Sequence, residues 1–434
     1  MSWTDRFRAL RMDVTPLRES RDFRLLLMAG TVFYLGSMVA YVAIPYQVYK
    51  LTGSNIAVGL IGLVELGPLI VFGLYGGALA DHVDRRRLLV STGIAQALLM
   101  VALAVNTFVG EPRVWLIFVL SGLLAAAGSM QRPSREALEP RTVRHELITA
   151  ANALSSFGVQ AGVLVGPAIG GLLIAYVGIG WCYLANIVGL SIAVVLFALM
   201  RPYPHLGETT PPSLQGIGEG IRYALSRRDL LGTYVVDLAA MMLAIPVVLF
   251  PALAEEVFDR PELLGLLYSA ETVGALVATG LSGWTARVHH HGRAIVIAAA
   301  FYGAFIALAG LSPTIWVALG FFMLAGAADM ISAVFRSTVW NQTIPDHMRG
   351  RLAGIEMLSY SVGPLGGQVR AGFVADAWSV RASIVSGGMA CVAGVMLTAV
   401  ALRDFWSYDN RTDEHAIAER EARSARATGG DRKN

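Results

Sequence analysis

Long apolar blocks without charged side chains constrain this chain more than any other feature of its sequence. Residues 147–200 contain no Asp, Glu, Lys or Arg. Five further blocks share this property: 25–49, 88–110, 114–131, 294–328 and 382–402. Each block has about 20 residues or a multiple of that, the length a helix needs to cross a hydrocarbon core of roughly 30 Å. With 15% charged residues in 434, the chain also has too little charge for a soluble domain of this size.

We therefore predict an all-α membrane protein that crosses the bilayer many times. Twelve transmembrane helices are expected: 23–47, 55–80, 88–109, 114–131, 147–175, 179–200, 230–253, 263–285, 293–311, 314–335, 352–376 and 382–402. The first block is too long for a cleavable signal and lacks a small-residue cleavage site at its end.

The cations in the connecting segments are unevenly distributed. The odd-numbered connections hold four: Lys50, Arg113, Arg260 and Arg381. The even-numbered connections hold 16: Arg85–Arg87, Arg132, Arg135, Arg141, Arg144, Arg201, Arg222, Arg227, Arg228, Arg287, Arg293, Arg336, Arg349 and Arg351. Because cytoplasmic loops carry the excess of Lys and Arg, both termini and all even connections are predicted to be cytoplasmic.

Several function classes find no support in the sequence. A net charge of +3 is too small to indicate nucleic-acid binding. No G-x-x-x-x-G-K-[ST] motif is present, so ATP is not expected to drive the protein directly. Three adjacent residues such as His289–His291 cannot all face one ion from a helix, and we predict a solvated loop there. Cys182 and Cys391 lie in apolar spans and give no disulfide framework. We expect no enzymatic activity, no metal and no cofactor.

The chain repeats itself weakly. A shift of 206 residues pairs Glu65 with Glu271, Gly77 with Gly283 and seven further identical residues within 47 positions, where composition alone gives roughly four. Two related six-helix halves fit this pattern, as in transporters built from parallel repeats. The predicted organisation is an N-terminal bundle at 1–200, a cytoplasmic linker at 201–229, a C-terminal bundle at 230–403 and a cytoplasmic tail at 404–434. Apolar residues at helical spacing in the linker predict an amphipathic helix on the membrane face, and the charged tail is predicted to be solvated.

The loop after the second span carries a motif. Residues Gly77 to Arg87 read GALADHVDRRR. A carboxylate at Asp81 can face a helix N-terminus or an arginine fork; a plain topological anchor is the alternative. The segment resembles the G-x-L-A-D-x-x-x-R-R signature of the major facilitator superfamily. The resemblance implies that Gly77, Asp81, Arg85 and Arg86 form a conformational latch between two halves of a transporter.

Glycines recur at every fourth position in the fifth span. Residues Gly158 to Gly171 read GVQAGVLVGPAIGG, a stripe that lets a neighbouring helix approach closely. The eleventh span repeats the device with Gly363, Pro364 and Gly367. Ordinary membrane packing explains such stripes. The first one also resembles the antiporter motif of major facilitator exporters, which favours efflux and includes Gly162, Gly166, Pro167, Gly170 and Gly171.

Further segments resemble one exporter branch of this superfamily, the branch that includes the enterobactin exporter. They begin at Asp22, Leu51, Ala151 and Ile344. The resemblance implies a catecholate siderophore or another amphipathic small molecule as substrate. Residues 114–131 lack the Arg that many proton-coupled members carry early in the fourth helix, which leaves the coupling route open.

Carboxylic acids inside the spans are the candidates for proton coupling, because ionisable groups are costly in hydrocarbon and face the protein interior or a water-filled cavity. Glu65 lies ~15 Å into its helix and Glu271 ~12 Å into the equivalent one. Burial favours the neutral form of a carboxyl group, so such a group can take up and release a proton. A structural hydrogen bond or ion pair, for example with Arg370, is the alternative. The full candidate set is Glu65, Glu271, Asp237, Asp329 and Glu356.

The sequence thus predicts a monomeric, proton-driven exporter that works by alternating access in the inner membrane. A multidrug exporter is the close alternative, and an importer or a non-transporting sensor the more remote ones. The expected partners are a small-molecule substrate, the bilayer, and outer-membrane or periplasmic export components, with no nucleic acid.

Topology gives the first testable prediction. Reporter fusions placed after Asn434 and within residues 202–212 should both report the cytoplasm, because the even connections hold most of the cations. A periplasmic signal from either fusion would contradict the two-half organisation.

Overall fold

The computed structural model describes residues 13–80, 83–203, 219 and 222–430. For some helical residues within these ranges only the backbone is described: 74–80, 346–347, 349–351, 353–359, 422–423 and 425–430. The long helices are α3 (Arg21–Thr52), α4 (Asn55–Ala80), α5 (Arg85–Phe108), α6 (Val114–Leu138), α7 (Ile148–Tyr176), α8 (Ile179–Ala198), α10 (Arg228–Ala244), α12 (Leu264–Gly280), α13 (His291–Leu311), α14 (Ile315–Thr343), α15 (Asp346–Ala377), α16 (Val380–Ala401) and α18 (Glu414–Gly430). Short helices join or flank them: α2 (Thr15–Glu19), η1 (Glu139–Arg141), η2 (His145–Leu147), η3 (Val247–Leu249), α11 (Phe250–Ala252), η4 (Leu253–Val257), η5 (Pro261–Leu263), η6 (Ser282–Arg287) and α17 (Arg403–Trp406).

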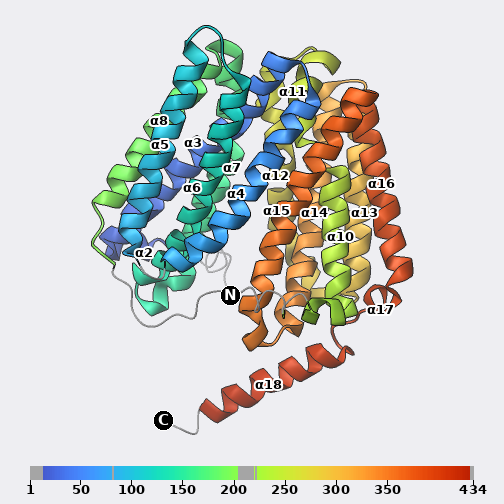
Figure 1. The fold of residues 1–434 in the computed structure, drawn as a ribbon. Helices are drawn as coiled ribbons and strands as arrows, with labels where there is room; N and C mark the ends of the chain where they lie inside the picture. The colour runs from blue at the N-terminus through green and yellow to red at the C-terminus, as the bar shows by residue number, and fades with distance from the viewer. Residues whose placement is uncertain (1–12, 81–82, 204–218, 220–221, 431–434) are drawn as a thin grey trace, which may run out of the picture. The chain divides into compact units, whose positions relative to one another are not determined.

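The described part of the chain is helical throughout (Figure 1). Eleven of its helical segments are long and apolar enough to cross a membrane, which confirms a multi-pass membrane protein. The predicted eleventh span, 352–376, coincides with α15, which is not among these eleven.

Contacts between Cα atoms divide the chain into two compact units. Unit 1 comprises residues 1–53 and 64–211, and unit 2 comprises residues 54–63 and 212–434. The first turns of α4 therefore group with unit 2. Asp376, at the end of α15, accepts hydrogen bonds from the backbone N–H groups of Asn55 (2.8 Å) and Ile56 (3.0 Å) and from the Ser54 hydroxyl (2.6 Å). A carboxylate in this position satisfies the otherwise unpaired N–H groups at the start of α4.

The glycine stripe of α7 lies against α3 in unit 1. A Cβ atom on Gly162 would lie 2.8 Å from Tyr34 Cβ, and one on Gly166 would lie 2.4 Å from Met38 Cβ. Gly170 packs on the backbone of Val39 in the same way. Helices can approach this closely only where the side chain is absent, so the stripe determines how α3 and α7 pack.

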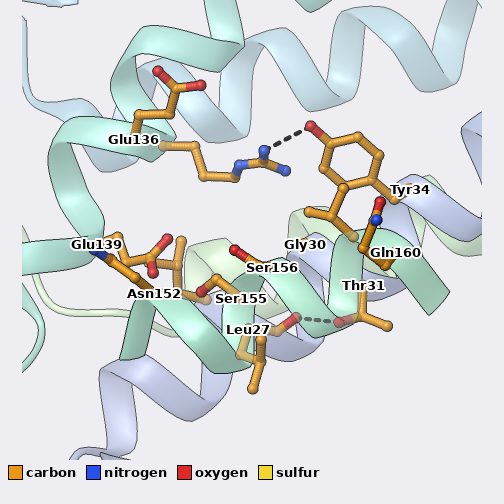
Figure 2. Close-up of a pocket in the computed structure, with 13 residues that line it drawn as sticks. Leu27, Gly30, Thr31, Tyr34, Glu136, Glu139, Asn152, Ser155, Ser156 and Gln160 are labelled. Carbon is orange, nitrogen blue, oxygen red and sulfur yellow. Dashed lines mark hydrogen bonds between the residues drawn. The ribbon is translucent and has the colours of Figure 1, made fainter. Parts of the chain in front are cut away.

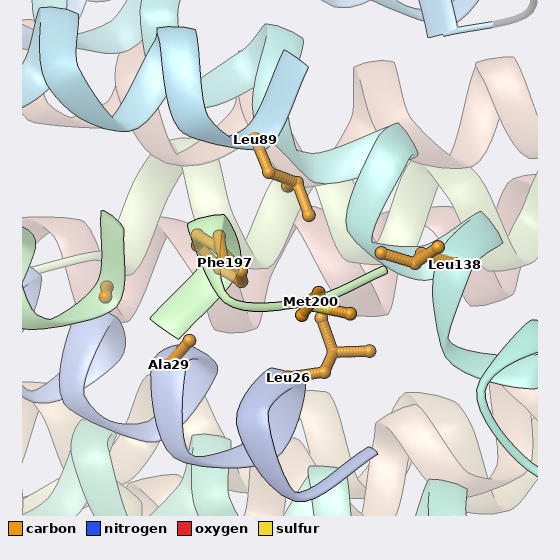
Figure 3. Close-up of a cluster of buried hydrophobic side chains, with 7 residues drawn as sticks. Leu26, Ala29, Leu89, Leu138, Phe197 and Met200 are labelled. Carbon is orange, nitrogen blue, oxygen red and sulfur yellow. The ribbon is translucent and has the colours of Figure 1, made fainter. Parts of the chain in front are cut away.

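A hydrophobic cluster fills the other side of α3. Leu26 and Ala29 of α3 contact Leu89 of α5, Leu138 of α6 and Phe197 of α8, and Ala193 and Met200 complete the cluster (Figure 3). All seven side chains are buried. Four helices of unit 1 therefore share one core at the end where α3 begins.

Unit 2 uses the same packing device between α10 and α15. A Cβ atom on Gly367 would lie 2.4 Å from the Met241 carbonyl oxygen, and one on Gly363 would lie 3.0 Å from Met241 Cβ. Unlike α3, the apolar segment that contains α10 is interrupted. The helix ends at Ala244 because Ile245 is extended (ψ 120°) before Pro246, a residue type that disfavours helical conformation at the preceding position. The predicted span 230–253 is thus two helical pieces.

The end of the chain is more ordered than its charge pattern suggested. Phe405 and Tyr408 are buried, and Ala416 of α18 is 3% exposed. The Arg228 guanidinium pairs with the Asp404 carboxylate (2.7 Å). Hydrogen bonds that Arg411 donates to the Asp409 carboxylate hold the pKa of Asp409 well below its usual range. The prediction of a solvated tail at 404–434 is therefore wrong for Phe405, Tyr408 and Ala416, because these side chains are buried against the rest of unit 2.

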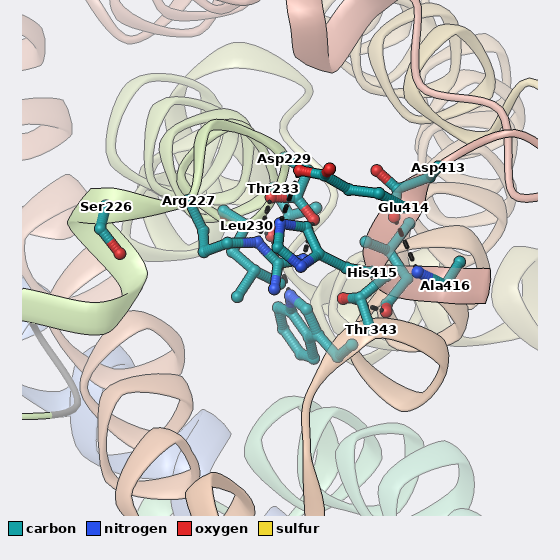
Figure 4. Close-up of polar contacts among 12 residues, drawn as sticks. Ser226, Arg227, Asp229, Leu230, Thr233, Thr343, Asp413, Glu414, His415 and Ala416 are labelled. Carbon is teal, nitrogen blue, oxygen red and sulfur yellow. Dashed lines mark hydrogen bonds and ion pairs between the residues drawn. The ribbon is translucent and has the colours of Figure 1, made fainter. Parts of the chain in front are cut away.

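Polar contacts surround this docking site. Arg227 and Asp229 form a buried ion pair (2.5 Å) at the start of α10. The first turn of α18 lies nearby, and there the Ala416 N–H donates to the Asp413 carboxylate (2.9 Å, Figure 4).

The predicted solvated loop at His289–His291 is also wrong in part. His291 is 3% exposed at the start of α13, where its ring contacts Phe335 and Tyr408. Of the predicted linker helix, residues 204–218 and 220–221 lie outside the described residues.

Gly166→Ala should destabilise the fold. The added methyl group would meet Met38 Cβ and the Leu35 carbonyl at 2.4 and 2.9 Å, so α3 and α7 must separate at a cost of about 1–3 kcal/mol. Thermal unfolding of the purified protein in detergent measures the loss as a lower Tm. The matched control is Gly320→Ala in α14, where nothing lies within 4 Å of the new atom and the Tm should hold or rise. Equal Tm values for the two variants would contradict this packing.

Candidate functional site

A close contact between two helices of unit 2 places the first pair of acidic residues. The Gly326 Cα of α14 faces the backbone of Glu271 in α12, and a Cβ atom there would lie 1.9 Å from the Glu271 carbonyl oxygen. Gly274 repeats the contact one turn later against Met323. Because Asp329 follows Gly326 by three residues on α14, its carboxyl group comes close enough to Glu271 for the two to interact electrostatically.

A guanidinium occupies the next turns of α14. Arg336 Nη2 lies 2.8 Å from Asp237 Oδ1 of α10 and 3.8 Å from Asp329 Oδ1. Its Nη1 donates to the Ser332 hydroxyl (3.1 Å). The side chains of Arg336 and Asp237 are 3% and 1% exposed, so this pair is almost completely removed from solvent.

Adjacent contacts hold α10 and α14 in this register. One turn along, the Trp340 indole N–H donates to the Thr233 hydroxyl (2.8 Å). The Trp340 ring also stacks on Tyr234, with ring centroids 5.3 Å apart. The ion pair and the Trp340–Thr233 hydrogen bond therefore join α10 and α14 at two neighbouring levels.

The three acidic residues differ in their surroundings. Asp237 is buried and paired with Arg336. Asp329 keeps 35% of its side chain accessible, although it lies deep in α14. The Glu271 Oε1 atom is buried and has no hydrogen-bond partner in the described part of the chain. Tyr302 of α13, which is 2% exposed, interacts electrostatically with all three.

Charge balance shows what this cluster can do. Three carboxylates against one guanidinium leave two negative charges uncompensated among the described side chains, which is costly within a membrane-spanning bundle. Protonation of Glu271 and Asp329 removes that cost and leaves the Arg336–Asp237 pair intact. The arrangement can therefore bind and release protons without loss of its structural ion pair. We call Glu271, Asp329, Asp237 and Arg336 the acidic cluster.

Two further proton-coupling candidates lie elsewhere. Glu65 is half-buried in α4, belongs to unit 1 and pairs with no described residue. Only the helical backbone is described for Glu356. Arg370, the suggested ion-pair partner, donates instead to the Ser383 carbonyl (3.4 Å).

The arginines of the predicted latch bind helix ends within unit 1. Arg85 donates to the Ala137 carbonyl of α6 (2.9 Å), and Arg86 donates to the Phe197 and Ala198 carbonyls of α8. Cations are favourable at such C-terminal ends, where carbonyl groups lack helical partners. Asp81 lies outside the described residues, and only the helical backbone is described for Gly77.

Arg336 is the member of the cluster that sequence reasoning assigned wrongly. We counted it as a loop cation because the tenth span was predicted to end at residue 335, whereas α14 continues to Thr343. A signal was present in the spacing: Arg336 follows Asp329 by seven residues, or two helical turns, so both lie on one face. Arg132 and Arg135, also counted as loop cations, lie in α6.

The predicted family resemblance is confirmed by comparison with known proteins. Residues 12–427 match the model of the family described as transmembrane secretion effector. The enterobactin exporter of Escherichia coli O1:K1 is 26% identical over 394 residues, which cover 90% of this chain and 94% of that protein. The enterobactin exporter of Shigella boydii serotype 18 has the same identity and coverage.

Solved structures show the same fold at lower identity. A bacterial homologue of the iron transporter ferroportin, in an inward-facing state, superposes with a TM-score of 0.66 at 17% identity, covering 89% of this chain and 99% of that one. A bacterial homologue of the human lysosomal transporter Spinster, inward-facing and unoccupied, gives 0.66 at 15% identity, covering 92% and 96%.

Arg336→Gln should destabilise the protein strongly, because it leaves the buried Asp237 carboxylate without its partner. Breaking a buried pair on one side costs about 3–5 kcal/mol. The double variant Asp237→Asn/Arg336→Gln should recover most of the lost thermal stability, since neither charge remains. Arg228→Gln is the control: its pair with Asp404 is exposed and is worth at most about 1 kcal/mol. A double variant no more stable than Arg336→Gln would argue against the ion pair as the stabilising contact.

Proposed function

Because the chain belongs to the transmembrane secretion effector family of the major facilitator superfamily, we propose that this membrane transporter exports an amphipathic small molecule, of the enterobactin type of siderophore, in exchange for protons. The observation that carries the proton coupling is the acidic cluster of unit 2. The support for the substrate is the similarity to proteins named enterobactin exporter.

Within the cluster, Glu271 and Asp329 are the proposed proton carriers. A carrier must change its protonation during the cycle, and both carboxyls lack a close cationic partner: Asp329 lies 3.8 Å from Arg336, and Glu271 Oε1 has no partner among the described groups. Asp237, at 2.8 Å from Arg336, is proposed to stay ionised and hold the guanidinium in place. Glu65 stays a candidate as the repeat-related counterpart of Glu271.

The remaining elements of the proposal concern how transport proceeds. Twelve spans in two six-helix bundles are proposed to rock about a site near the bilayer midplane, with both termini in the cytoplasm and the chain in the inner membrane as a monomer. The segment with Gly77, Asp81, Arg85 and Arg86 is proposed to latch one conformation. The stripe around Pro167 is proposed to favour outward transport. Neither ATP nor a cofactor is needed, since the proton gradient supplies the energy.

Glu271→Gln should abolish gradient-driven transport while substrate binding is retained. The amide keeps the shape of the carboxyl group but cannot carry a proton through the cycle. The measurement is pH-gradient-driven movement of enterobactin into liposomes that contain the purified protein, alongside equilibrium binding of enterobactin. We expect a transport rate that is at least about tenfold lower than that of the native protein and a Kd within about threefold of the native value. A factor of ten corresponds to about 1.4 kcal/mol. Glu262→Gln in η5 is the matched control, because this carboxylate is 35% exposed and already pairs with Arg260 (3.3 Å).

The outcomes separate the alternatives. Full gradient dependence in Glu271→Gln would remove this residue as carrier and leave Asp329, tested as Asp329→Asn, or Glu65, tested as Glu65→Gln. Loss of binding together with transport would place Glu271 in the substrate site. Transport of amphipathic drugs without transport of enterobactin would favour a multidrug exporter. Transport by the native protein that does not depend on the pH gradient would contradict proton-driven export altogether.

A further inference from the structure

A cavity of about 600 Å³ lies within unit 1, between α3, α6 and α7 (Figure 2). It is lined by residues of two kinds. Leu27 and Val159 are apolar, whereas Tyr34, Asn152 and Gln160 are polar. At 1.5 Å per residue the cavity extends from ~6 Å to ~20 Å along helices that start at the predicted cytoplasmic face. Its volume lies in the range of pockets that hold small molecules.

One wall of the cavity carries a cation, Arg135, that forms no close ion pair with a described carboxylate. Arg135 Nη2 donates to the Tyr34 hydroxyl (2.8 Å), and the guanidinium lies over the Tyr34 ring at 4.6 Å from its centroid. Gly30 of α3 leaves room for the Nη1 atom, 3.8 Å from where a Cβ would lie. A guanidinium has five N–H groups that can donate, and only one of those of Arg135 donates to the Tyr34 hydroxyl. Arg135 is therefore held in place with donors and charge available to the cavity.

The same wall carries an acceptor that lacks a donor. Glu139 follows Arg135 by four residues and lies in η1. Its Oε1 atom is buried and finds no hydrogen-bond partner among the described groups. The Ser155 hydroxyl lies beside the Glu139 carboxylate (Figure 2). No close ion pair joins Glu139 to Arg135 in the described structure. Buried polar atoms without partners are uncommon in folded proteins, and this oxygen is available to accept a hydrogen bond from a ligand.

These positions restrict the chemistry of such a ligand. It must present an oxygen acceptor, such as an amide or carboxylate oxygen, to Arg135 and a hydrogen-bond donor, such as a hydroxyl, to Glu139. The apolar side chains of Leu27 and Val159 favour a hydrocarbon part between these groups.

We propose that this cavity is a binding subsite for a hydroxylated aromatic amide or acid, whose carbonyl oxygen accepts from Arg135 and whose hydroxyl groups donate to Glu139. The proposal rests on the proposed function, since it names the part of an exported molecule that unit 1 recognises. The residues are distinct from the acidic cluster, which lies in unit 2.

Three small probes test the two contacts separately with the full-length protein in nanodiscs. The first, 3,4-dihydroxybenzamide, has both groups; benzamide lacks the hydroxyls, and 3,4-dihydroxytoluene lacks the carbonyl. Glu139→Met should weaken binding of the first probe about tenfold or more but leave benzamide unchanged. Arg135→Met should weaken the first probe similarly but leave 3,4-dihydroxytoluene unchanged. The factor is what loss of a hydrogen bond to a charged group produces.

Matched controls come from the same region. Arg132→Met replaces an arginine on α6 that is 68% exposed, paired with Glu136 and outside the cavity lining. Glu146→Met replaces an exposed glutamate of η2. Both should bind all three probes as the native protein does, and thermal unfolding checks that each variant is folded.

The proposal would be overturned by no binding of 3,4-dihydroxybenzamide to the native protein, or by equal losses for all three probes in the cavity variants and the controls. Preferred binding of tetraphenylphosphonium or of a zwitterionic amino acid would assign the cavity to another ligand class and also overturn it. Transport in liposomes tests the proposed function independently. Probe binding that depends on Arg135 and Glu139 without enterobactin transport would refute the export function alone.

Discussion

The free-energy cost of polar groups in hydrocarbon is the constraint on which the rest of the structure depends. Backbone N–H and C=O groups must be paired within the membrane, so the apolar blocks of the sequence form helices. Lipid tails are as apolar as leucine, and helices gain little from hiding leucine from them. Close backbone approach at Gly166, Gly326 and Gly367 supplies the packing contacts instead. The glycine positions thereby decide which helices pair.

The same cost explains why the charged side chains inside the helices are informative. The charges of Arg336 and Asp237 compensate each other, and both side chains are almost completely out of contact with solvent. Asp329 lies farther from Arg336 (3.8 Å), and Glu271 Oε1 has no hydrogen-bond partner among the described residues. A stable fold alone would not require such an imbalance. Protons that arrive and leave during a transport cycle would account for it.

An arginine joins two long helices in each unit. Arg135 of α6 reaches α3 in unit 1, and Arg336 of α14 reaches α10 in unit 2. In unit 2 the partner is the carboxylate of Asp237, which neutralises Arg336. In unit 1 the partner is the neutral phenol of Tyr34, which leaves the charge of Arg135 available. This difference separates the proposed proton site of unit 2 from the proposed ligand site of unit 1.

The sequence by itself determined the helical class, the positions of most spans and the membership of the family, because these depend on local composition, on the length of apolar runs and on short motifs. It also identified Glu271, Asp237 and Asp329 as acids inside the helices. It could not show that Arg336 belongs with them, since the pairing of Arg336 with Asp237 joins two helices that are far apart in the chain. The docking of residues 403–416 and the unpaired Glu139 oxygen were equally hidden. Each of these arises from contacts between residues far apart in the chain, and such contacts exist only once the tertiary structure has brought the helices together.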